Sequence, residues 1–386
     1  MMYMKVRLGN YIEEYSKKNK ADEDIPVYSV TSTQGFCRDY FGKEVASKDK
    51  TTYKIVPQGC FAYNPSRINV GSVDWQRNEE RVIVSPLYNV FSVSEELDQE
   101  YLYYYLKSDF ALQRIRAVAT GSVRDNLKLE MLKEFPILLP PKNDQKTIAN
   151  NLDRVKRIIE LRKSEIDKMN ELIKARFVEM FGDLANPECS WDKSKLIDVC
   201  TDKDDIKCGP FGTQLNKDEY IESGIAVWEI PQINAAFLIN PTHFLTEEKA
   251  EQLKAYTIIP GDIAMSRKGN VGKCALFPDN YPEGIIHSDV LRIRVDRKRI
   301  NPLFMMCQLH FSGSVTRQIE LVSSGAIMAG VNVTKLKQIY VHVPPVEWQN
   351  QFADFVHQVD KSKVAVQKAL EKTQLLFDSL MQQYFG

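Results

Sequence analysis

A long stretch of this chain occurs twice. The segment that begins at Leu132 reads LKEFPILLPPKNDQKTIANNLDRV, and the segment that begins at Leu336 reads LKQIYVHVPPVEWQNQFADFVHQV. The two copies need no gap, because the same 204 residues separate Leu132 from Leu336 and Gly182 from Gly386, where each copy closes on Phe-Gly. A repeat of about 200 residues is far too long for one unit of a solenoid. It predicts that one domain followed by one long helix occurs twice.

Each copy changes from a strand pattern to a helix pattern at a pair of prolines. The apolar runs of residues 135–139 and 339–343 are typical of strands, and they end at residues 140–141 and 344–345, both Pro-Pro. Proline cannot continue the hydrogen bonds of a sheet, whereas its fixed φ suits the first turn of a helix. We therefore expect a long helix to begin directly after each proline pair.

The residues that follow the prolines repeat with the alternating four–three spacing of a coiled-coil seam. The apolar seam residues are Ile148, Leu152, Val155, Ile159, Ile166, Met169 and Ile173 in the first copy, and Phe352, Val356, Val359, Val366, Leu370, Phe377 and Leu380 in the second. Charged or polar residues at 162, 176, 363 and 373 interrupt the pattern. A helix of roughly 38 residues is about 57 Å long and cannot bury such a stripe alone. We expect the two copies to pair as an antiparallel rod; the alternative is two unrelated core helices, one in each domain.

Length and repeat together predict four segments. They are a first domain at residues 1–141, a helix at 142–182, a second domain at 183–345 and a helix at 346–386. In the first domain we expect strands at 25–31, 53–62 and 82–93, and a helix at 100–116 whose tyrosines at 101, 104 and 105 belong to the core. In the second domain we expect strands at 225–230, 257–264 and 285–295, and a helix at 301–320. The glycine-rich residues 207–215 have no counterpart in the first domain, so the frame repeats while the loops differ.

The charge of the chain is balanced, because its 386 residues contain 51 Lys and Arg and 51 Asp and Glu. Nucleic-acid binding would therefore need local basic patches or charge from a partner. Seven cysteines without a C-x-x-C motif, and five histidines without metal-ligand spacing, favour a reducing compartment and argue against a metal or disulfide framework. No apolar run reaches about 18 residues, and no signal-peptide pattern is present. We expect a cytoplasmic protein without membrane contact.

Polar and basic residues occur in loops at matching places of the two domains. Arg, Lys, Asn and Gln suit base edges in the major groove, and Ser, Thr and Lys suit phosphates. The candidates for DNA contact are Ser32, Gln34, Asn64, Arg67, Asn69, Ser72, Ser122 and Arg124 in the first domain, and Thr213, Gln214, Ser266, Arg267, Lys268, Asn270 and Lys273 in the second. Glycines flank Arg267 and Lys268, and nothing nearby in the sequence pairs with them. The alternative for each residue is an ordinary solvated loop.

Catalytic motifs are absent from the sequence. The pairs Gly209-x-x-Gly212 and Gly269-x-x-Gly272 are too short for a nucleotide-binding loop and lack its lysine. The segment of residues 64–67, Asn-Pro-Ser-Arg, matches only half of the Asn-Pro-Pro-aromatic loop of amino methyltransferases. Acidic residues near lysines on the long helices are typical of a solvated face. We therefore expect no enzyme activity in this chain.

Several of these features together resemble the specificity subunit of type I restriction–modification enzymes. They are the Pro-Pro followed by Gln in both repeats, the closing Phe-Gly, the Gly-Pro-Phe-Gly of residues 209–212 and the Gly-Asp-Ile of residues 261–263. The resemblance covers nearly the whole chain. It departs from the family in the first domain, which lacks the Gly-Pro-Phe-Gly loop and begins only a few residues before Lys5.

The resemblance implies an α+β fold with two similar target-recognition domains, separated by an antiparallel pair of long coiled-coil helices. Each domain would read one half of a bipartite site in double-stranded DNA, and the helices would set the spacer and dock modification subunits, of which two are expected. S-adenosylmethionine and the methylating site would belong to those subunits, so no cofactor is expected here; restriction subunits would join in hosts that have them. The alternatives are a two-domain coiled-coil protein adaptor without DNA specificity and, more weakly, a stand-alone enzyme.

Overall fold

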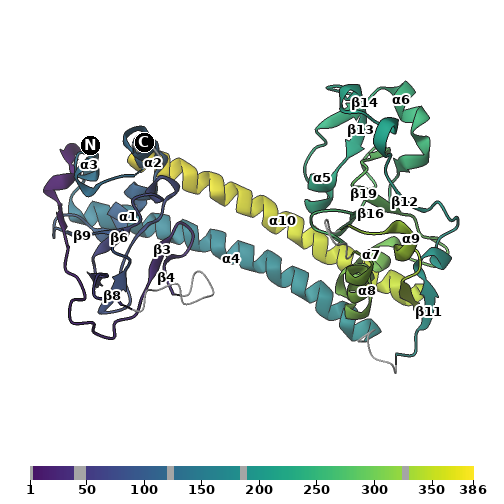
Figure 1. The fold of residues 1–386 in the computed structure, drawn as a ribbon, viewed down its shortest axis with the longest axis horizontal. Coiled ribbons are helices and arrows are strands. Elements are labelled where there is room, and N and C mark those ends of the chain that lie inside the picture. Colours follow the sequence, from purple (N-terminus) through teal and green to yellow (C-terminus); the bar gives the residue numbers. More distant parts are fainter. Residues whose placement is uncertain (1–2, 39–48, 120–125, 183–188, 324–329) are drawn as a thin grey trace. The chain divides into compact units, whose positions relative to one another are not determined.

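The computed structural model describes residues 3–38, 49–119, 126–182, 189–323 and 330–386 (Figure 1). Contacts between residues divide the chain into two units, which are Met1–Ser164 with Gln367–Gly386 (unit 1) and Glu165–Val366 (unit 2). The division falls inside both long helices, α4 (Lys142–Phe181) and α10 (Val346–Phe385). Each unit therefore contains one globular domain and one end of the helix pair.

Unit 1 is built on a four-stranded antiparallel sheet in the order β2-β9-β6-β7, with the pairs β5-β8, β3-β4 and β1-β10 beside it. Its strands are β1 (Met4–Arg7), β2 (Ile12–Glu14), β3 (Ser29–Thr31), β4 (Gly35–Cys37), β5 (Lys54–Pro57), β6 (Phe61–Tyr63), β7 (Val73–Trp75), β8 (Arg81–Val84), β9 (Asn89–Val93) and β10 (Pro136–Leu139). Its short helices are α1 (Gln99–Lys107), α2 (Asp109–Val118) and α3 (Leu129–Lys133). The predicted strand at 25–31 is wrong except for its last three residues.

Two expectations for the helical part of unit 1 have different outcomes. The predicted helix at 100–116 is two helices, because Ser108 ends α1 in extended backbone and its Oγ accepts a hydrogen bond from Ala111 N as the N-cap of α2. The tyrosines on α1 are core residues as predicted, since Tyr101, Tyr104 and Tyr105 are all buried. They pack in one cluster with the sheet and with the C-terminal end of α10.

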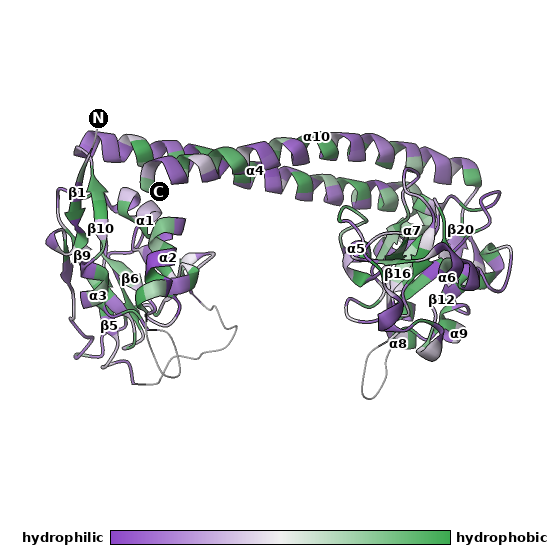
Figure 2. Ribbon diagram, turned by 90° about the horizontal axis from the view of Figure 1, so that it is seen from above, coloured by the Kyte–Doolittle hydropathy of each residue, from purple (hydrophilic) through white to green (hydrophobic). Residues whose placement is uncertain are grey.

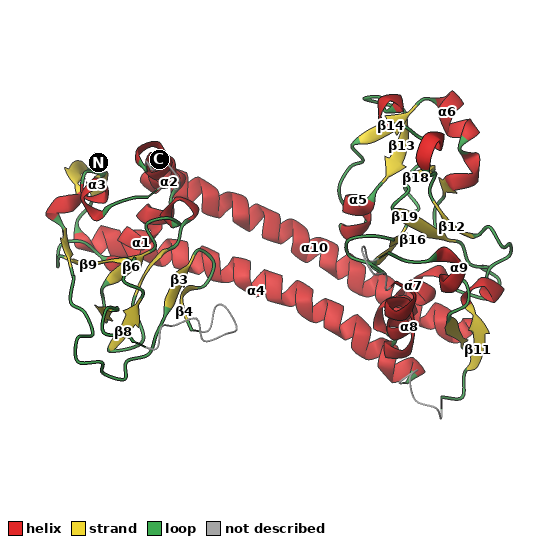
Figure 3. Ribbon diagram, in the orientation of Figure 1, coloured by secondary structure: helices red, strands yellow, loops and turns green. Residues whose placement is uncertain are grey.

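Unit 2 repeats this arrangement and enlarges it. Its strands are β11 (Asp192–Lys195), β12 (Ile206–Cys208), β13 (Ile225–Trp228), β14 (His243–Leu245), β15 (Thr257–Ile258), β16 (Ile263–Ser266), β17 (Cys274–Leu276), β18 (Gly284–Ile286), β19 (Val290–Ile293) and β20 (Tyr340–Val343). Its short helices are α5 (Ile230–Asn234), α6 (Glu247–Gln252), α7 (Pro302–Phe311), α8 (Gly313–Ser323) and α9 (Val333–Leu336). The predicted helix at 301–320 is again two helices, α7 and α8 (Figure 3). Ser312 lies between them in the sequence.

The sequence repeat is also a repeat of topology. The order β12-β19-β16-β17 in unit 2 corresponds to β2-β9-β6-β7 in unit 1, β15-β18 corresponds to β5-β8, and β11-β20 corresponds to β1-β10. In both units the strand before the prolines pairs antiparallel with the first strand of its domain. Unit 2 differs because β13 and β14 extend the β15-β18 pair to a second four-stranded sheet.

The two predicted long helices are confirmed, and each has 40 residues. In unit 1 the start of α4 packs against the end of α10, through Ile148, Leu152 and Phe385. In unit 2 the end of α4 packs against the start of α10, through Ile173 and Phe352. The helices are therefore antiparallel. None of the seam residues named above is exposed, whereas hydrophilic residues cover most of the remaining helix surface (Figure 2).

The polar interruptions of the seam have partners. The guanidinium of Arg162 on α4 donates hydrogen bonds to the carbonyl oxygen of Ala369 and the Oγ1 of Thr373 on α10, so two interruptions meet each other. Arg176 lies 5.7 Å from the centre of the Phe355 ring. A polar contact inside an apolar seam favours one register, because any other register leaves the polar groups without partners.

A buried glutamine ties each helix start to its domain. In unit 1, Gln145 accepts a hydrogen bond from Asp98 N at 2.8 Å and donates to the carbonyl oxygens of Glu96 and Pro140 at 3.0 and 2.9 Å. Gln349 makes the same three kinds of contact in unit 2, with Asn301 N and with the carbonyl oxygens of residues 299 and 344. Asp98 and Asn301 are the N-caps of α1 and α7. The glutamine that follows Pro-Pro in the repeat therefore joins the long helix to α1 in unit 1 and to α7 in unit 2.

Candidate DNA interface

The Gly-Pro-Phe-Gly loop of unit 2 presents a phenylalanine to solvent. Gly209 is required at its position, because an added Cβ would lie 2.3 Å from the carbonyl oxygens of Ile286 and His287. Beyond it, the Oε1 of Gln214 accepts hydrogen bonds from Phe211 N at 3.1 Å and from the hydroxyl of Tyr256 at 3.0 Å. These contacts shape the loop, and the Phe211 side chain remains 47% exposed.

The second loop of this surface begins where β16 ends. Arg267 N donates to the carbonyl oxygen of Asp289 at 2.8 Å, and the carbonyl oxygen of Arg267 accepts from Val331 N at 3.1 Å. The side chain of Arg267 lies with its guanidinium carbon 4.7 Å from the centre of the Phe211 ring. Gly269 and Gly272 have φ of +70° and +82°, a left-handed conformation that glycine adopts at little cost. Three segments far apart in sequence thus meet at one arginine.

Lys268 has a partner that the sequence did not indicate. Its Nζ lies 2.8 Å from the Oδ1 of Asp289 in the turn between β18 and β19, so the expectation that nothing pairs with this basic loop is wrong for Lys268. Both side chains are partly exposed, and an ion pair of this kind contributes at most about 1 kcal/mol to stability. Such a pair can open when a stronger anion such as a phosphate approaches.

The other candidates of unit 2 divide by exposure. Thr213, Gln214, Asn270 and Lys273 are exposed. Ser266 is fully buried, because it is the last residue of β16 and that strand is buried along its whole length. Ser266 therefore does not present its hydroxyl to a ligand in this structure.

The candidates of unit 1 lie in two places. Ser32 and Gln34 are exposed in the turn between β3 and β4, and the carbonyl oxygen of Ser32 accepts a hydrogen bond from the Nζ of Lys107 at 3.0 Å. Arg67 is exposed and Asn64 and Asn69 are half-buried between β6 and β7, whereas Ser72 is buried in the same segment. The candidates Ser122 and Arg124 lie outside the described residues.

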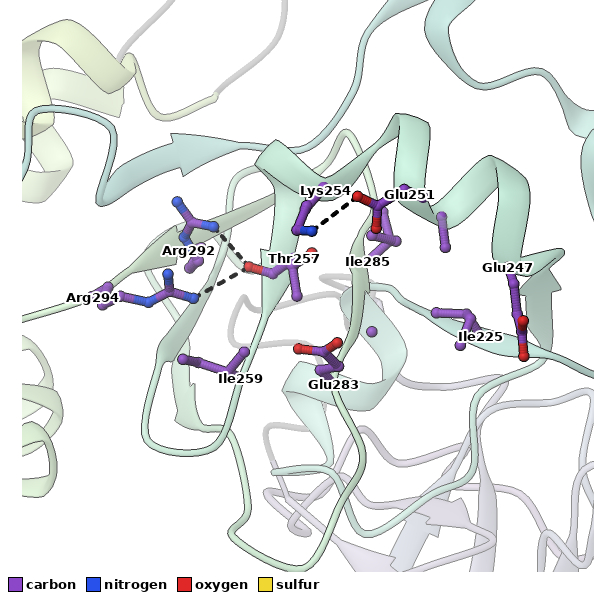
Figure 4. Close-up of a pocket in the computed structure, with 12 residues that line it drawn as sticks. Ile225, Glu247, Glu251, Lys254, Thr257, Ile259, Glu283, Ile285, Arg292 and Arg294 are labelled. Atoms are coloured by element: carbon purple, nitrogen blue, oxygen red, sulfur yellow. Dashed lines mark hydrogen bonds and ion pairs between the residues drawn. The ribbon is translucent and has the colours of Figure 1, made fainter.

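A cleft of about 450 Å³ in unit 2 is lined by two arginines and three glutamates (Figure 4). Arg292 donates to the carbonyl oxygens of Thr257 and Asp204, each at 2.7 Å, and burial lowers its pKa. Arg294 forms an ion pair with the buried Asp262 at 2.7 Å, and its hydrogen bonds to that carboxylate raise its pKa. These arginines hold strands and loops of the domain together. The glutamates at 247, 251 and 283 make the cleft unsuited to a polyanion.

Within the residues that the structure describes, no group of three or more His, Cys, Asp or Glu side chains could hold a metal ion. Over the same ranges, no helix combines the length and apolar character needed to cross a membrane. The seven cysteines are free.

Comparison with known families decides what this architecture belongs to. Residues 7–171 and 189–375 each match the family described as type I restriction modification DNA specificity domain. Together the two matches cover most of the chain, and each match covers one copy of the repeat. The chain belongs to this family. It is a DNA sequence-recognition component of a restriction–modification complex, and the expectation that it has no catalysis of its own is confirmed, because specificity subunits are non-catalytic.

Two curated relatives support the assignment of this specificity subunit. The MjaVIII specificity subunit of Methanocaldococcus jannaschii is 22% identical over 390 residues, which cover 95% of this chain and 90% of that protein. The EcoBI specificity subunit of Escherichia coli is 22% identical over 376 residues, covering 89% and 78%. Neither points to the coiled-coil adaptor considered from the sequence.

A solved structure confirms the fold of the specificity subunit. The crystal structure of the S subunit from M. genitalium superposes with a TM-score of 0.58 at 17% identity, covering all of this chain and 96% of that one. A chain from a solved type I restriction–modification system gives the same TM-score at 16% identity, covering 99% and 97%.

Reasoning from the sequence missed two residues of the candidate interface in the specificity subunit. Phe211 was part of a motif that carried the resemblance, but an exposed aromatic residue cannot be told from a core residue before the loop is folded. Asp289 lies 21 residues beyond Lys268, and only the pairing of β16 with β19 brings them together.

Proposed function

We propose that each globular domain of this specificity subunit reads one half of a bipartite DNA target. The observation that carries the proposal is a repeated frame with different loops. The four-stranded sheets β2-β9-β6-β7 and β12-β19-β16-β17 have the same order, whereas the Gly-Pro-Phe-Gly sequence and, among the described residues, strands like β13 and β14 occur only in unit 2. Two modules with one architecture and different exposed loops are suited to bind two different half-sites on one duplex.

The long helices would set the distance between the half-sites. A 40-residue helix is about 60 Å long, and the family profile continues through most of both helices. The contact of Arg162 with Thr373 favours a single register of the seam, so the helix pair has a defined length. A spacer of defined length is what a bipartite site with a constant gap requires.

Two modification subunits would dock on the specificity subunit, one for each copy of the repeat. Leu172 on α4 and Leu376 on α10 occupy equivalent positions at the offset of 204, and their side chains are 51% and 50% exposed. One of them belongs to each unit. Exposed leucines at repeated positions favour two equivalent contacts for apolar partner surfaces. S-adenosylmethionine and the methylating site would belong to those partners.

The test is a genome-wide map of methylated positions in the host, with and without the gene for this chain. The proposal expects a bipartite methylated sequence that disappears with the gene. A chimaera that carries the first domain of a related subunit, joined at the proline pair of residues 140–141, should change the first half-site alone. A change in both half-sites would show that the modules are not independent. Loss of the gene without any change in methylation would refute the proposed function.

A further inference from the structure

The guanidinium of Arg267 has two contacts within the domain, and its two Nη atoms donate no hydrogen bond to any residue that the structure describes. Its Nε donates to the carbonyl oxygen of Val331 at 3.4 Å, and its Cζ atom lies 4.7 Å from the centre of the Phe211 ring. No carboxylate of a described residue forms an ion pair with Arg267, and the carboxylate of Asp289 pairs with Lys268. A planar fork with its outer edge available is the arrangement that binds two acceptors at once.

Phe211 supplies the aromatic ring that the guanidinium of Arg267 contacts. The glycine-rich loop holds Phe211 by its backbone, through Gly209 against the carbonyl oxygens of 286 and 287 and through Gln214 Oε1. An aromatic side chain that is 47% exposed gains little from burial in the domain. The contact of Phe211 that can affect DNA binding is the one with Arg267.

We propose that Phe211 is a positioning residue that orients Arg267 for bidentate contact with O6 and N7 of a guanine in the second half-site. This inference rests on the proposed function, because it requires that unit 2 reads one half-site. The bidentate contact of arginine with guanine is the commonest specific contact in the major groove. Contact of Arg267 with a phosphate instead would weaken binding to all sequences alike and would not change discrimination at one base.

The expected loss of base discrimination differs in size between substitutions of Phe211 and of Arg267. A good bidentate contact discriminates against a wrong base by roughly 5- to 150-fold. A cation–π contact at an exposed site corresponds to roughly two- to five-fold. Removal of the Phe211 ring should therefore relax discrimination at one position by roughly two- to five-fold. Removal of the Arg267 fork should relax the same position by the larger factor.

The experiment compares four variants of the full chain in the host, together with its modification subunits. They are Phe211→Leu, Phe211→Tyr, Arg267→Lys and the control Leu238→Ala, which removes an 84% exposed apolar side chain from the same unit. Discrimination is the ratio of methylation at the wild-type sequence to methylation at sequences with one changed base. Phe211→Leu and Arg267→Lys should relax one and the same position of the second half-site. Phe211→Tyr and Leu238→Ala should keep wild-type discrimination, and the first half-site should be unchanged throughout.

Two further readouts keep the outcomes distinct. Arg267→Lys retains the charge, so purified complexes should keep the salt dependence of their affinity for DNA while losing discrimination. Thermal unfolding of each variant shows whether its domain is intact, and Arg267→Lys tests the same contact if Phe211→Leu does not fold. Folded variants that keep full discrimination, relax different positions, or weaken binding to all sequences equally would overturn the inference. Absence of any bipartite methylated sequence in the wild type would instead refute the proposed function.

Discussion

The buried side chain of Gln145 offers a sharp test of how the repeat joins each long helix to its domain. It accepts one hydrogen bond from Asp98 N and donates two, to the carbonyl oxygens of Glu96 and Pro140. Gln145→Ala removes all three contacts. Each unsatisfied backbone group costs about 1 kcal/mol or more, so the free energy of unfolding of unit 1 should fall by about 3 kcal/mol.

Gln145→Glu should add a dependence on pH that Gln145→Ala lacks. A glutamate keeps the acceptor for Asp98 N but places its other oxygen about 3 Å from two carbonyl oxygens, a contact that only the protonated acid tolerates. The pKa of this glutamate in the folded state is therefore raised above its unfolded value near 4.3. Stability is then highest at low pH and is lost as pH rises toward the folded pKa. The slope reaches about 1.4 kcal/mol per pH unit between the two pKa values, so the variant should be less stable at pH 8 than at pH 5 by more than about 1 kcal/mol.

The assay is urea unfolding of the full chain followed by hydrogen exchange of peptides from unit 1, at pH 5, 6.5 and 8. All five histidines of the chain lie between residues 243 and 357, in unit 2. Unit 1 therefore suits this test, because no histidine of its own changes charge between pH 5 and pH 8. The wild type and Gln145→Ala serve as controls for the pH dependence of the remaining chain. Equal destabilisation by Gln145→Glu at pH 5 and pH 8 would refute the reasoning, because the carboxylate would then not face the two carbonyl oxygens.

Three further predictions concern the seam, the histidines and the spacer. The combined variant Arg162→Leu and Thr373→Val should be as stable as the wild type or more so. Arg162→Leu alone should lose about 0.5–1.5 kcal/mol, because the buried hydroxyl of Thr373 loses one partner but still donates to the carbonyl oxygen of Ala369. Thermal unfolding measures both variants. Burial lowers the pKa of His310 and of His342 below 6.5. The neutral forms of these histidines therefore contribute stability above pH 6.5, and this contribution is lost as pH falls through their folded-state pKa values. Calorimetry from pH 7.5 to 5 should show unit 2 weakening, and His342→Gln should reduce that weakening. Deleting residues 163–169 and 363–369, one heptad from each long helix, should shorten the spacer of the methylated sequence by about 10 Å, or about three base pairs, and an unaltered spacer would contradict the proposed role of the helices.

Much of the fold could be read from the sequence because its signals are local or periodic. A proline pair excludes a strand ladder wherever it occurs, and a four–three spacing places its residues on one helix face regardless of the partner. The gap-free repeat further predicted that equivalent residues of the two halves pack in the same way. The signals were weakest for short strands and for breaks inside helices. Ser108 caps α2, and Ser312 lies between α7 and α8, and neither residue interrupts the apolar pattern of the sequence around it.

The candidate site depended on contacts between segments far apart in the chain. Residue type and glycine spacing indicated the loop of Arg267, but only the folded sheet places it against Phe211 and brings Asp289 to Lys268. The same sheet buries Ser266, since side chains at a strand end follow the burial of the strand and not the polarity of the residue. The sequence by itself determined the repeat, the long helices and the family; the tertiary structure decided which polar residues face solvent, because exposure and pairing depend on neighbours that sequence order does not specify.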